Sequence, residues 1–293
     1  MKALVTGGSG LLGAEIARLL SEAGHDVLSA FKTHPPPVGN PIRLDLSELD
    51  KIQPKFQKAR PDLIVHTAAM SDVDLCEENP DIANEVNGKA TGKIGEAASH
   101  VGAYVVYVST DYVFDGQIGS YREEDKPNPI NHYGKSKLLG EELLRESGAR
   151  QCIVRTSVLY GWGREYRPNF ATWILHRLES DEHVKVVNDQ VASPTLNLNL
   201  AQMILELAAK QYEGVLHLAG ATRTNRYTFA KQVAEAFNLD PSLIEPVKSD
   251  QIDWKAKRPA DSSLNVDRAS RVLDRKPLEL HEALEQFRAA KRQ

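Results

Sequence analysis

Short apolar runs alternate with longer amphipathic segments over the first half of the chain. The runs hardly mix with polar residues, which is typical of strands that a parallel sheet buries on both faces. They lie at residues 3–6, 26–30, 42–44, 63–66, 104–108 and 152–155. After the first run, Leu12, Ile16 and Leu19 recur at helical spacing until Gly24, which is typical of a helix and its end.

The segments between the apolar runs predict helices over residues 47–58, 81–99 and 131–147. Strands that alternate with helices imply right-handed crossovers and a mostly parallel sheet. The fold class that we predict is therefore α/β, a Rossmann-type doubly wound parallel sheet.

The last third of the chain is less regular and has more frequent Gly and Pro breaks. It predicts helices over residues 169–179, 198–210, 227–237 and 280–290, and strands over 184–187 and 215–218. A smaller lobe interwoven with the main domain fits this pattern better than a separable domain. We expect a dinucleotide-binding domain in residues 1–157 with 189–222. A substrate-binding lobe would take residues 158–188 with 223–293.

Composition narrows the class of protein without changing this picture. The 293 residues carry a formal net charge of −4, so no basic field favours nucleic acid or an anionic membrane. Cys76 and Cys152 stand far apart, which favours buried thiols over a disulfide scaffold or a zinc site. No apolar run reaches the ~20 residues of a membrane helix, and the N-terminal residues lack the regions of a signal peptide. We expect a cytoplasmic protein without a bound metal.

A glycine-rich turn, GGSGLLG, lies between the first predicted strand and the first predicted helix. Glycine there permits a tight turn, close approach of the backbone to a pyrophosphate, and close packing of helix on strand. The start of the helix then offers N–H groups and the positive end of its dipole to the anion. This context favours a dinucleotide site over a merely structural turn. The cofactor-binding residues would be Gly7, Gly10, Leu11, Leu12 and Gly13.

The end of the second predicted strand bears on the choice of cofactor. An NAD-selective site usually has an acidic residue there, on the ribose hydroxyls. This chain has Lys32 instead, and Asp26 lies at the wrong end of the strand. Lys32 can pair with a 2′-phosphate, which favours NADP(H), with NAD(H) possible. The alternative is that Lys32 is a solvated loop lysine and both cofactors are accepted.

A hydroxyl, a phenol and an ammonium group are expected to meet at the carboxyl edge of the sheet. Thr110 follows the run at 104–108, and Tyr133 and Lys137 share a helix face. A free tyrosine titrates near ~10, and a nearby ammonium group favours its phenolate and lowers the pKa toward the working range. Thr110 would align a substrate oxygen, Tyr133 would give it a proton, and a nicotinamide would deliver hydride to the carbon. The alternative is a surface tyrosine and lysine.

These residues resemble the triad of the extended short-chain dehydrogenases/reductases, which is Ser or Thr, Tyr and Lys. Longer segments resemble the dTDP-4-dehydrorhamnose reductases, from the glycine turn to about Asp267. The segments are STDYVFDG at 109–116, YREED at 121–125, NHYGKSK at 131–137, RTS at 155–157, DQVASPT at 189–195 and RPADSSL at 258–264.

The resemblance implies roles for further residues on the cofactor side. Asp45 and Leu46 would lie near the adenine, and Ala68 and Ala69 near the ribose. Asn87 would support the active site from a helix. Two alternatives remain open: Asp45 begins a turn before a helix, and Asn87 is a satisfied polar residue.

On the substrate side, the resemblance implies that Asp111 and Tyr112 contact the sugar and that Arg258 lies by the nucleotide-sugar lobe. For Arg258, a salt bridge is the alternative. Many of these reductases have a tryptophan after the RTS segment, and this chain has Val158 there, with Trp162 beyond as a candidate substitute. This departure leaves the hydride chemistry intact and the identity of the sugar open.

The resemblance leaves three functions open. The leading one is NADPH-dependent reduction of the 4-keto group of a dTDP-6-deoxy-4-ketohexose, by a monomer or a homodimer. The second is a regulatory role, because the beta subunit of methionine adenosyltransferase resembles these reductases and binds NADP. The C-terminal residues 289–293 show no clear motif for insertion into a catalytic subunit. The third is a nucleotide-sugar epimerase or dehydratase, although no Asp-Glu pair follows Thr110.

Overall fold

A seven-stranded parallel sheet forms the centre of the computed structural model, which describes residues 1–163 and 168–291. Its strands run in the order β3-β2-β1-β4-β5-β6-β11. Their bounds are Lys2–Thr6 (β1), Asp26–Phe31 (β2), Asn40–Arg43 (β3), Leu63–His66 (β4), Tyr104–Thr110 (β5), Gln151–Thr156 (β6) and Gly214–His217 (β11). The direction of strand addition reverses between β1 and β4, which is the arrangement of a doubly wound fold and confirms the predicted fold class.

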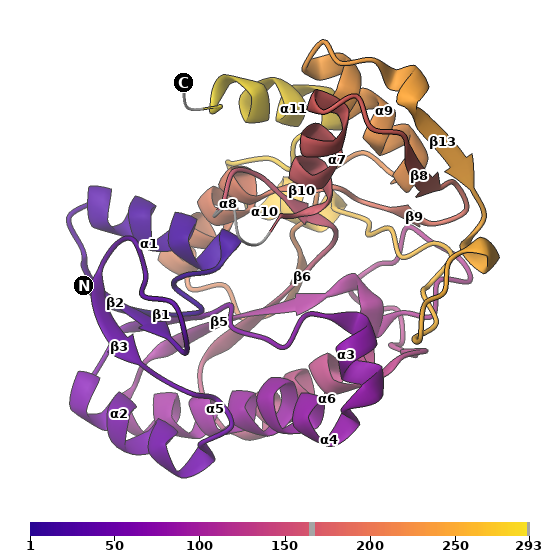
Figure 1. The fold of residues 1–293 in the computed structure, drawn as a ribbon. Coiled ribbons are helices and arrows are strands. Elements are labelled where there is room, and N and C mark those ends of the chain that lie inside the picture. Colours follow the sequence, from indigo (N-terminus) through magenta and orange to yellow (C-terminus); the bar gives the residue numbers. More distant parts are fainter. Residues whose placement is uncertain (164–167, 292–293) are drawn as a thin grey trace.

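Helices cover both faces of this sheet (Figure 1). One face carries α1 (Leu11–Glu22) packed on α8 (Asn197–Lys210), and the other carries α2 (Ile52–Ala59), α5 (Ala90–Val101) and α6 (His132–Glu146). Adjacent residues of β1 show why both faces are needed. Val5 belongs to the apolar core under α1 and α8, whereas Leu4 belongs to the core over α2 and α5. Successive strand residues point to opposite faces, so a strand this apolar is stable only between two layers.

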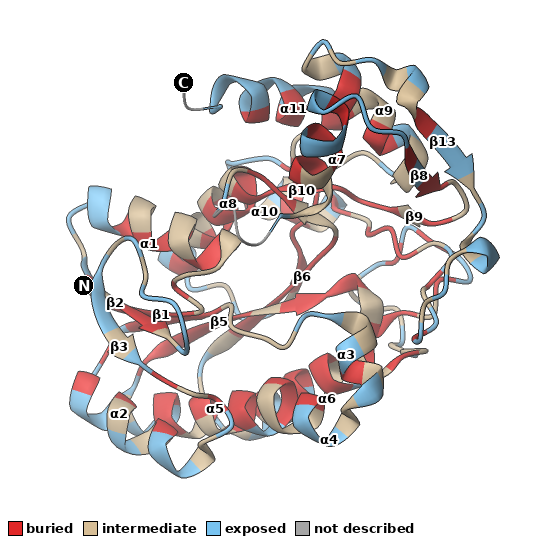
Figure 2. Cartoon of the chain, viewed as in Figure 1, coloured by how far each residue is buried: buried red, intermediate tan, exposed pale blue. Residues whose placement is uncertain are grey.

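A third apolar core lies in the C-terminal lobe, around Tyr160, Phe229 and Phe287. It is built from α7 (Phe170–Glu179), α9 (Arg226–Ala236) and α11 (Leu280–Ala289), with the parallel pair β8 (Val184–Val187) and β13 (Ile244–Val247). Figure 2 shows the buried sides of these helices turned toward one another. Because α8 and β11 follow part of this lobe in sequence yet pack on the central sheet, the lobe is interwoven with the main domain. The proposed boundaries stay a prediction, and residues 164–167 and 292–293 lie outside the described residues.

The segment between β4 and β5 differs from its prediction. The single helix expected over residues 81–99 is α4 (Pro80–Ala83), a π-helical turn η2 (Asn84–Lys89) and α5, and α3 (Val73–Glu78) precedes them. Apolar periodicity cannot reveal one extra residue in a helical turn, and such turns gather at functional sites. Likewise, the helix expected over 47–58 begins as a 3-10 turn, η1 (Leu49–Lys51), before α2.

Short elements complete the described chain. They are η3 (Asp111–Val113), β7 (Leu159–Tyr160), β9 (Val191–Ala192), β10 (Thr195–Leu196), β12 (Thr224–Asn225), η4 (Pro241–Leu243), η5 (Ser249–Gln251) and α10 (Asp267–Val272). Strand β13 was not predicted, because Pro246 interrupts its pattern and its pairing with β8 is non-local. Among the helices of the described residues, none is long and apolar enough to cross a membrane.

A buried ion pair joins α6 to β6. Arg155 donates to Glu141 through Nε at 3.0 Å and Nη2 at 2.7 Å, and both side chains are almost inaccessible to solvent. Ser109 donates to the same carboxylate at 2.7 Å. Burial alone would raise the pKa of Glu141, but the hydrogen bonds and charge of Arg155 outweigh it and lower the pKa. The carboxylate is therefore ionised. Arg155 is its buried cation, and the partly exposed Arg145 pairs with it at 3.1 Å.

We predict that Arg155→Leu lowers the free energy of unfolding by about 3 kcal/mol or more, because it leaves the buried Glu141 carboxylate with only the partly exposed Arg145 as a cation. The double variant Glu141→Leu/Arg155→Leu should lose less, since no unpaired charge remains. Urea unfolding of the single and double variants measures this difference. A double variant less stable than Arg155→Leu would contradict the prediction.

Candidate active site

A cavity of about 580 Å³ opens at the carboxyl ends of β1, β4 and β5. This is where ligands bind in open α/β sheets, at the point where strand order reverses. The cavity brings together most of the residues that the sequence predicted, from six separate segments of the chain. They are Gly7, Gly10, Leu11, Leu12, Gly13, Lys32, Asp45, Leu46, Ala68, Ala69, Thr110, Asp111, Tyr133 and Lys137.

The glycine turn forms one wall of the cavity and is tightly packed. Gly7 has a φ of 67°, and a Cβ there would lie 3.0 Å from the backbone nitrogen of Ala68. A Cβ on Gly13 would collide with the carbonyl oxygen of Gly7. Gly10 stands at the N-cap of α1, where it offers no side chain to the first N–H groups, and the first turn contains no acidic residue. The turn therefore fits a pyrophosphate, because nothing on it competes for or repels an anion.

Lys32 and Asp45 lie together at the edge of the cavity, and their charged atoms are 3.0 Å apart. Asp45 also accepts hydrogen bonds from the backbone and side chain of Ser47, so it begins a turn as well. Burial alone would raise the pKa of Asp45, but the bonds from Ser47 and Lys32 lower it. Lys32 is 62% exposed, so its ammonium group can turn to another anion.

The predicted triad meets at the end of β5 and the start of α6. Asn131 caps α6 by accepting from the N–H of Gly134 at 2.8 Å, which fixes the turn that carries Tyr133. Thr110 accepts from the N–H of Tyr112 at 3.2 Å and donates to Asp111 at 2.9 Å. The cap and these bonds fix the directions of the phenol and the hydroxyl before any substrate binds.

Burial controls the protonation of Tyr133 and Lys137. It raises the pKa of Tyr133 well above its usual value, and a hydrogen bond with Thr110 opposes it. The expected net lowering of this pKa toward the working range is therefore wrong, because burial outweighs it. Burial lowers the pKa of Lys137 itself to about 7, against the field of Glu141. Its Nζ donates to Val108 O at 2.8 Å, over the ring of Tyr107. Tyr133 thus keeps its proton at neutral pH, which suits a general acid.

Asp111 and Tyr112, which were predicted to contact the substrate, have different surroundings. Asp111 is only 3% exposed, and its carboxylate accepts from Ser157 at 2.7 Å and Ser262 at 2.5 Å as well as from Thr110. Its burial raises its pKa against these hydrogen bonds. Tyr112 packs edge-on against Tyr133, with ring centres 5.9 Å apart.

Arg258 and Asn87 do not line the cavity. Arg258 pairs with Asp74 at 3.0 Å, which is the salt bridge considered as its alternative. Asn87 is buried in the π-helical turn, where it accepts from the Met70 N–H at 2.8 Å and donates to Ser136 at 2.9 Å. It is therefore a satisfied polar residue that joins the loop after β4 to α6.

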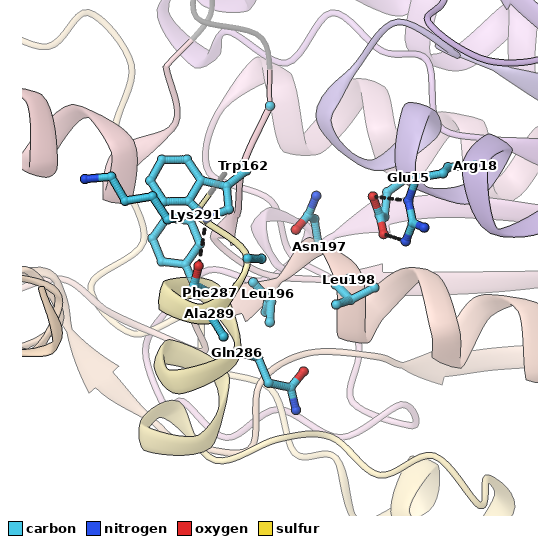
Figure 3. A pocket seen from close by; sticks show the side chains of 12 residues that line it. Glu15, Arg18, Trp162, Leu196, Asn197, Leu198, Gln286, Phe287, Ala289 and Lys291 are labelled. Carbon is cyan, nitrogen blue, oxygen red and sulfur yellow. Dashed lines mark hydrogen bonds and ion pairs between the residues drawn. The ribbon is translucent and has the colours of Figure 1, made fainter. Parts of the chain in front are cut away.

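Trp162 belongs to the core of the C-terminal lobe. Its ring stacks on Phe287 at 4.6 Å, and its Nε1 donates to the carbonyl oxygen of that residue at 2.7 Å. Figure 3 shows it in a second cavity of about 580 Å³, across from Glu15, which pairs with Arg18. Among the described residues, Trp162 lines this second cavity and not the first, so it does not replace the missing tryptophan there. Val158 lines the first cavity instead.

The sequence argument missed cavity residues contributed by the C-terminal lobe. Leu159 lies after β6, next to Val158, and Pro168 and Asn169 precede α7. The rule that ligands gather at carboxyl ends of parallel strands would have indicated the residues after β6. Nothing local would have indicated those before α7.

Comparisons with known proteins agree with this geometry. The profile of a family described as the RmlD substrate binding domain matches residues 1–292. The chain is 34% identical to the probable low-salt glycan biosynthesis reductase Agl14 of Haloferax volcanii, over 91% of this chain and 90% of that protein. It is 32% identical to methionine adenosyltransferase 2 subunit beta of Bos taurus, over 91% of this chain and 81% of that protein.

Two solved structures share the whole fold. A hypothetical dTDP-4-dehydrorhamnose reductase from Sulfolobus tokodaii has a TM-score of 0.86 and 38% identity, covering 96% of this chain and 98% of the other. The dTDP-4-dehydrorhamnose reductase from Bacillus anthracis, solved in complex with NADP, has a TM-score of 0.89 and 31% identity, covering 98% of both chains. The resemblance that the sequence motifs indicated is therefore confirmed.

The lowered pKa of Lys137 predicts how stability depends on pH. Between pH 7 and about 10 the unfolded chain binds a proton at this lysine that the folded protein has released. The free energy of unfolding should therefore rise over this range, and Lys137→Met should flatten the rise. Urea unfolding at pH 7, 8 and 9 measures it. Lys93→Met, a partly exposed lysine on α5, is the control and should keep the rise; equal slopes in both variants would contradict the assignment.

Proposed function

Because the chain belongs to the RmlD substrate binding domain family, we propose that it reduces the 4-keto group of a nucleotide-linked sugar with NADPH. The substrate that we favour is a dTDP-6-deoxy-4-ketohexose, such as dTDP-4-dehydro-L-rhamnose, which would become dTDP-L-rhamnose or a close analogue. The observation that carries the proposal is the meeting of the glycine turn with Thr110, Tyr133 and Lys137 around one cavity of about 580 Å³.

A bound nicotinamide would supply hydride to the carbonyl carbon. The residues of this chain would donate and orient the proton that the carbonyl oxygen receives. Burial keeps the phenol of Tyr133 protonated. Tyr133 would give this proton to the carbonyl oxygen, so that the product is an alcohol. The ammonium form of Lys137 would favour the phenolate that remains. Thr110, held by Asp111 and by the N–H of Tyr112, would orient the phenol and the substrate oxygen.

Two observations support NADP(H) as the cofactor. Lys32 lies at the end of β2 on the edge of the cavity, where a 2′-phosphate would lie, and the similar Bacillus anthracis protein was solved with NADP. The pair between Lys32 and Asp45 also supports NAD(H) as an alternative, since Asp45 already balances the charge of Lys32. We propose that Asp45 and Leu46 lie by the adenine and Ala68 and Ala69 by the ribose.

One other function has a specific observation in its favour. The chain is 32% identical to the methionine adenosyltransferase beta subunit over 91% of its length, so a regulatory role is the second candidate. Co-purification with a methionine adenosyltransferase, without turnover of any ketosugar, would favour it. A dehydratase is less well supported, because Tyr112 stands where an Asp-Glu pair would place its second acid.

The reductase proposal predicts that Tyr133→Phe lowers turnover by about 10²–10⁴-fold, because the substrate oxygen loses its proton donor. Dinucleotide binding should be retained, since the glycine turn is untouched. The measurement is a coupled assay with dTDP-glucose, its upstream dehydratase and epimerase, and NADPH. Unchanged turnover in the variant would exclude Tyr133 as the acid.

The cofactor proposal predicts that Lys32→Ala weakens NADPH binding about tenfold and leaves NADH binding unchanged, because only NADPH carries the 2′-phosphate. Fluorescence titration of both dinucleotides measures this. Lys51→Ala, a lysine of η1 that does not line the cavity, is the matched control and should change neither affinity. Equal losses for NADPH and NADH would mean that Lys32 does not recognise the phosphate.

A further inference from the structure

A buried histidine behind the cavity joins two parts of the candidate site. His66 ends β4 and is 1% exposed. Its Nδ1 lies 2.7 Å from Oγ1 of Thr6, on the neighbouring strand β1, and its Nε2 lies 3.1 Å from Oγ1 of Thr91, on α5. A buried imidazole with a partner on each nitrogen can connect the two elements that provide those partners.

The direction of each hydrogen bond follows from the groups at the two ends. Thr6 Oγ1 accepts from the N–H of Ala68 at 3.2 Å, so its own proton is free to bond Nδ1 of His66. Thr91 Oγ1 gives its proton to the carbonyl oxygen of Asn87 at 2.7 Å, so it must accept from Nε2 of His66. Of the two neutral tautomers of the imidazole, only the one with its proton on Nε2 satisfies all four bonds.

The surroundings keep His66 neutral. Burial lowers its pKa to about 3, and the charge of Lys137 acts in the same direction. The ring stacks on Tyr107 at 5.2 Å, and the ammonium group of Lys137 lies 4.2 Å from the centre of that tyrosine ring. The imidazole is therefore neutral, and Thr6 donates to its Nδ1.

The hydrogen bonds of Thr6, at one end of this path through His66, fix the glycine turn. Thr6 directly precedes Gly7, and its carbonyl oxygen accepts from Thr67 Oγ1 at 2.7 Å. A Cβ on Gly7 would collide with Thr67 and Ala68, so the turn is tightly packed against these residues. A shift of the Thr6 side chain would therefore move the turn that we propose holds the pyrophosphate.

The Thr91 end fixes the catalytic helix. The carbonyl oxygen that accepts from Thr91 belongs to Asn87, in the π-helical turn η2. The side chain of Asn87 donates to Ser136 at 2.9 Å, and Ser136 in turn donates to the carbonyl oxygen of Tyr133 at 2.8 Å. Ser136 lies between Tyr133 and Lys137 on α6. The series of hydrogen bonds from His66 therefore ends at the proposed proton donor, Tyr133.

We propose that His66 is a positioning residue that holds the glycine turn and the first turn of α6 in one fixed relation. The inference rests on the proposed reductase function. A rigid relation matters there because hydride and proton must reach the two atoms of one carbonyl group, and small misplacements reduce rate strongly.

The two ring nitrogens can be removed separately. In His66→Asn, the amide oxygen takes the place of Nδ1 and can still accept from Thr6, but the bond to Thr91 is lost. In His66→Gln, the longer amide takes the place of Nε2 and can still donate to Thr91, but the bond to Thr6 is lost. His66→Leu removes both bonds and keeps an apolar side chain of similar size.

We expect the effects to divide in the same way. His66→Gln should weaken NADPH binding about tenfold and leave kcat within about twofold, because the turn loses its support. His66→Asn should bind NADPH normally and lose about tenfold in kcat, because α6 loses its support. His66→Leu should show both losses. Fluorescence titration gives the NADPH affinity, and the coupled assay gives kcat.

Controls separate this proposal from a packing role. His100 is an exposed histidine on α5 that bonds Glu96, so His100→Asn and His100→Gln should change neither constant. Thr6→Val should repeat the effect of His66→Gln, and Thr91→Val that of His66→Asn. These two variants also replace the histidine variants if any of those fails to fold in thermal unfolding.

Equal losses in the Asn and Gln variants, or wild-type constants in both, would overturn the positioning role. The failure of the proposed function has a different signature. If the wild-type protein turns over no ketosugar, the reductase proposal fails, whereas the NADPH titration still tests the Thr6 end. In that case normal NADPH binding by His66→Gln and Thr6→Val overturns the inference, and the tenfold loss supports it.

Discussion

The parallel pairing of β1 with both β2 and β4 is the constraint on which the rest of this structure depends. The chain leaves β1 toward one edge of the sheet and returns at β4 toward the other, so the loops after these two strands separate. A crevice must open between them, because no crossover connection covers that point. The glycine turn, the loop at Ala68 and Ala69, and the end of β5 reach the same cavity for this reason.

Burial then decides the chemistry of the groups around that crevice. Tyr133, Lys137 and His66 are all removed from water, and burial opposes the charged form of each. The phenol keeps its proton, the ammonium group gives its proton up more easily, and the imidazole stays neutral. Where water is absent, the direction of each hydrogen bond is set by protein partners, so the site is oriented before a ligand arrives.

Polar contacts join the C-terminal lobe to the residues around the cavity. Asp111, at the end of β5, accepts from Ser157 after β6 and from Ser262 of the lobe. Asp74 on α3 accepts from the backbone of Lys255 and Ala256 and pairs with Arg258. These contacts hold the lobe over the cavity, and Asp111 at the same time holds Thr110. One carboxylate thus connects the position of the lobe to the orientation of the Thr110 hydroxyl.

The sequence alone determined what depends on local pattern: the βα order, the glycine turn, and the shared helix face of Tyr133 and Lys137. It also indicated Thr110, because strand ends of a parallel sheet share one edge. Tertiary structure decided what depends on burial and on distant partners. The raised pKa of Tyr133, the π-helical turn at Asn87, the packing of Trp162 on Phe287 and the pairing of β13 with β8 all follow from non-local contacts. Periodicity reports which face of an element is apolar, but not what that face will meet.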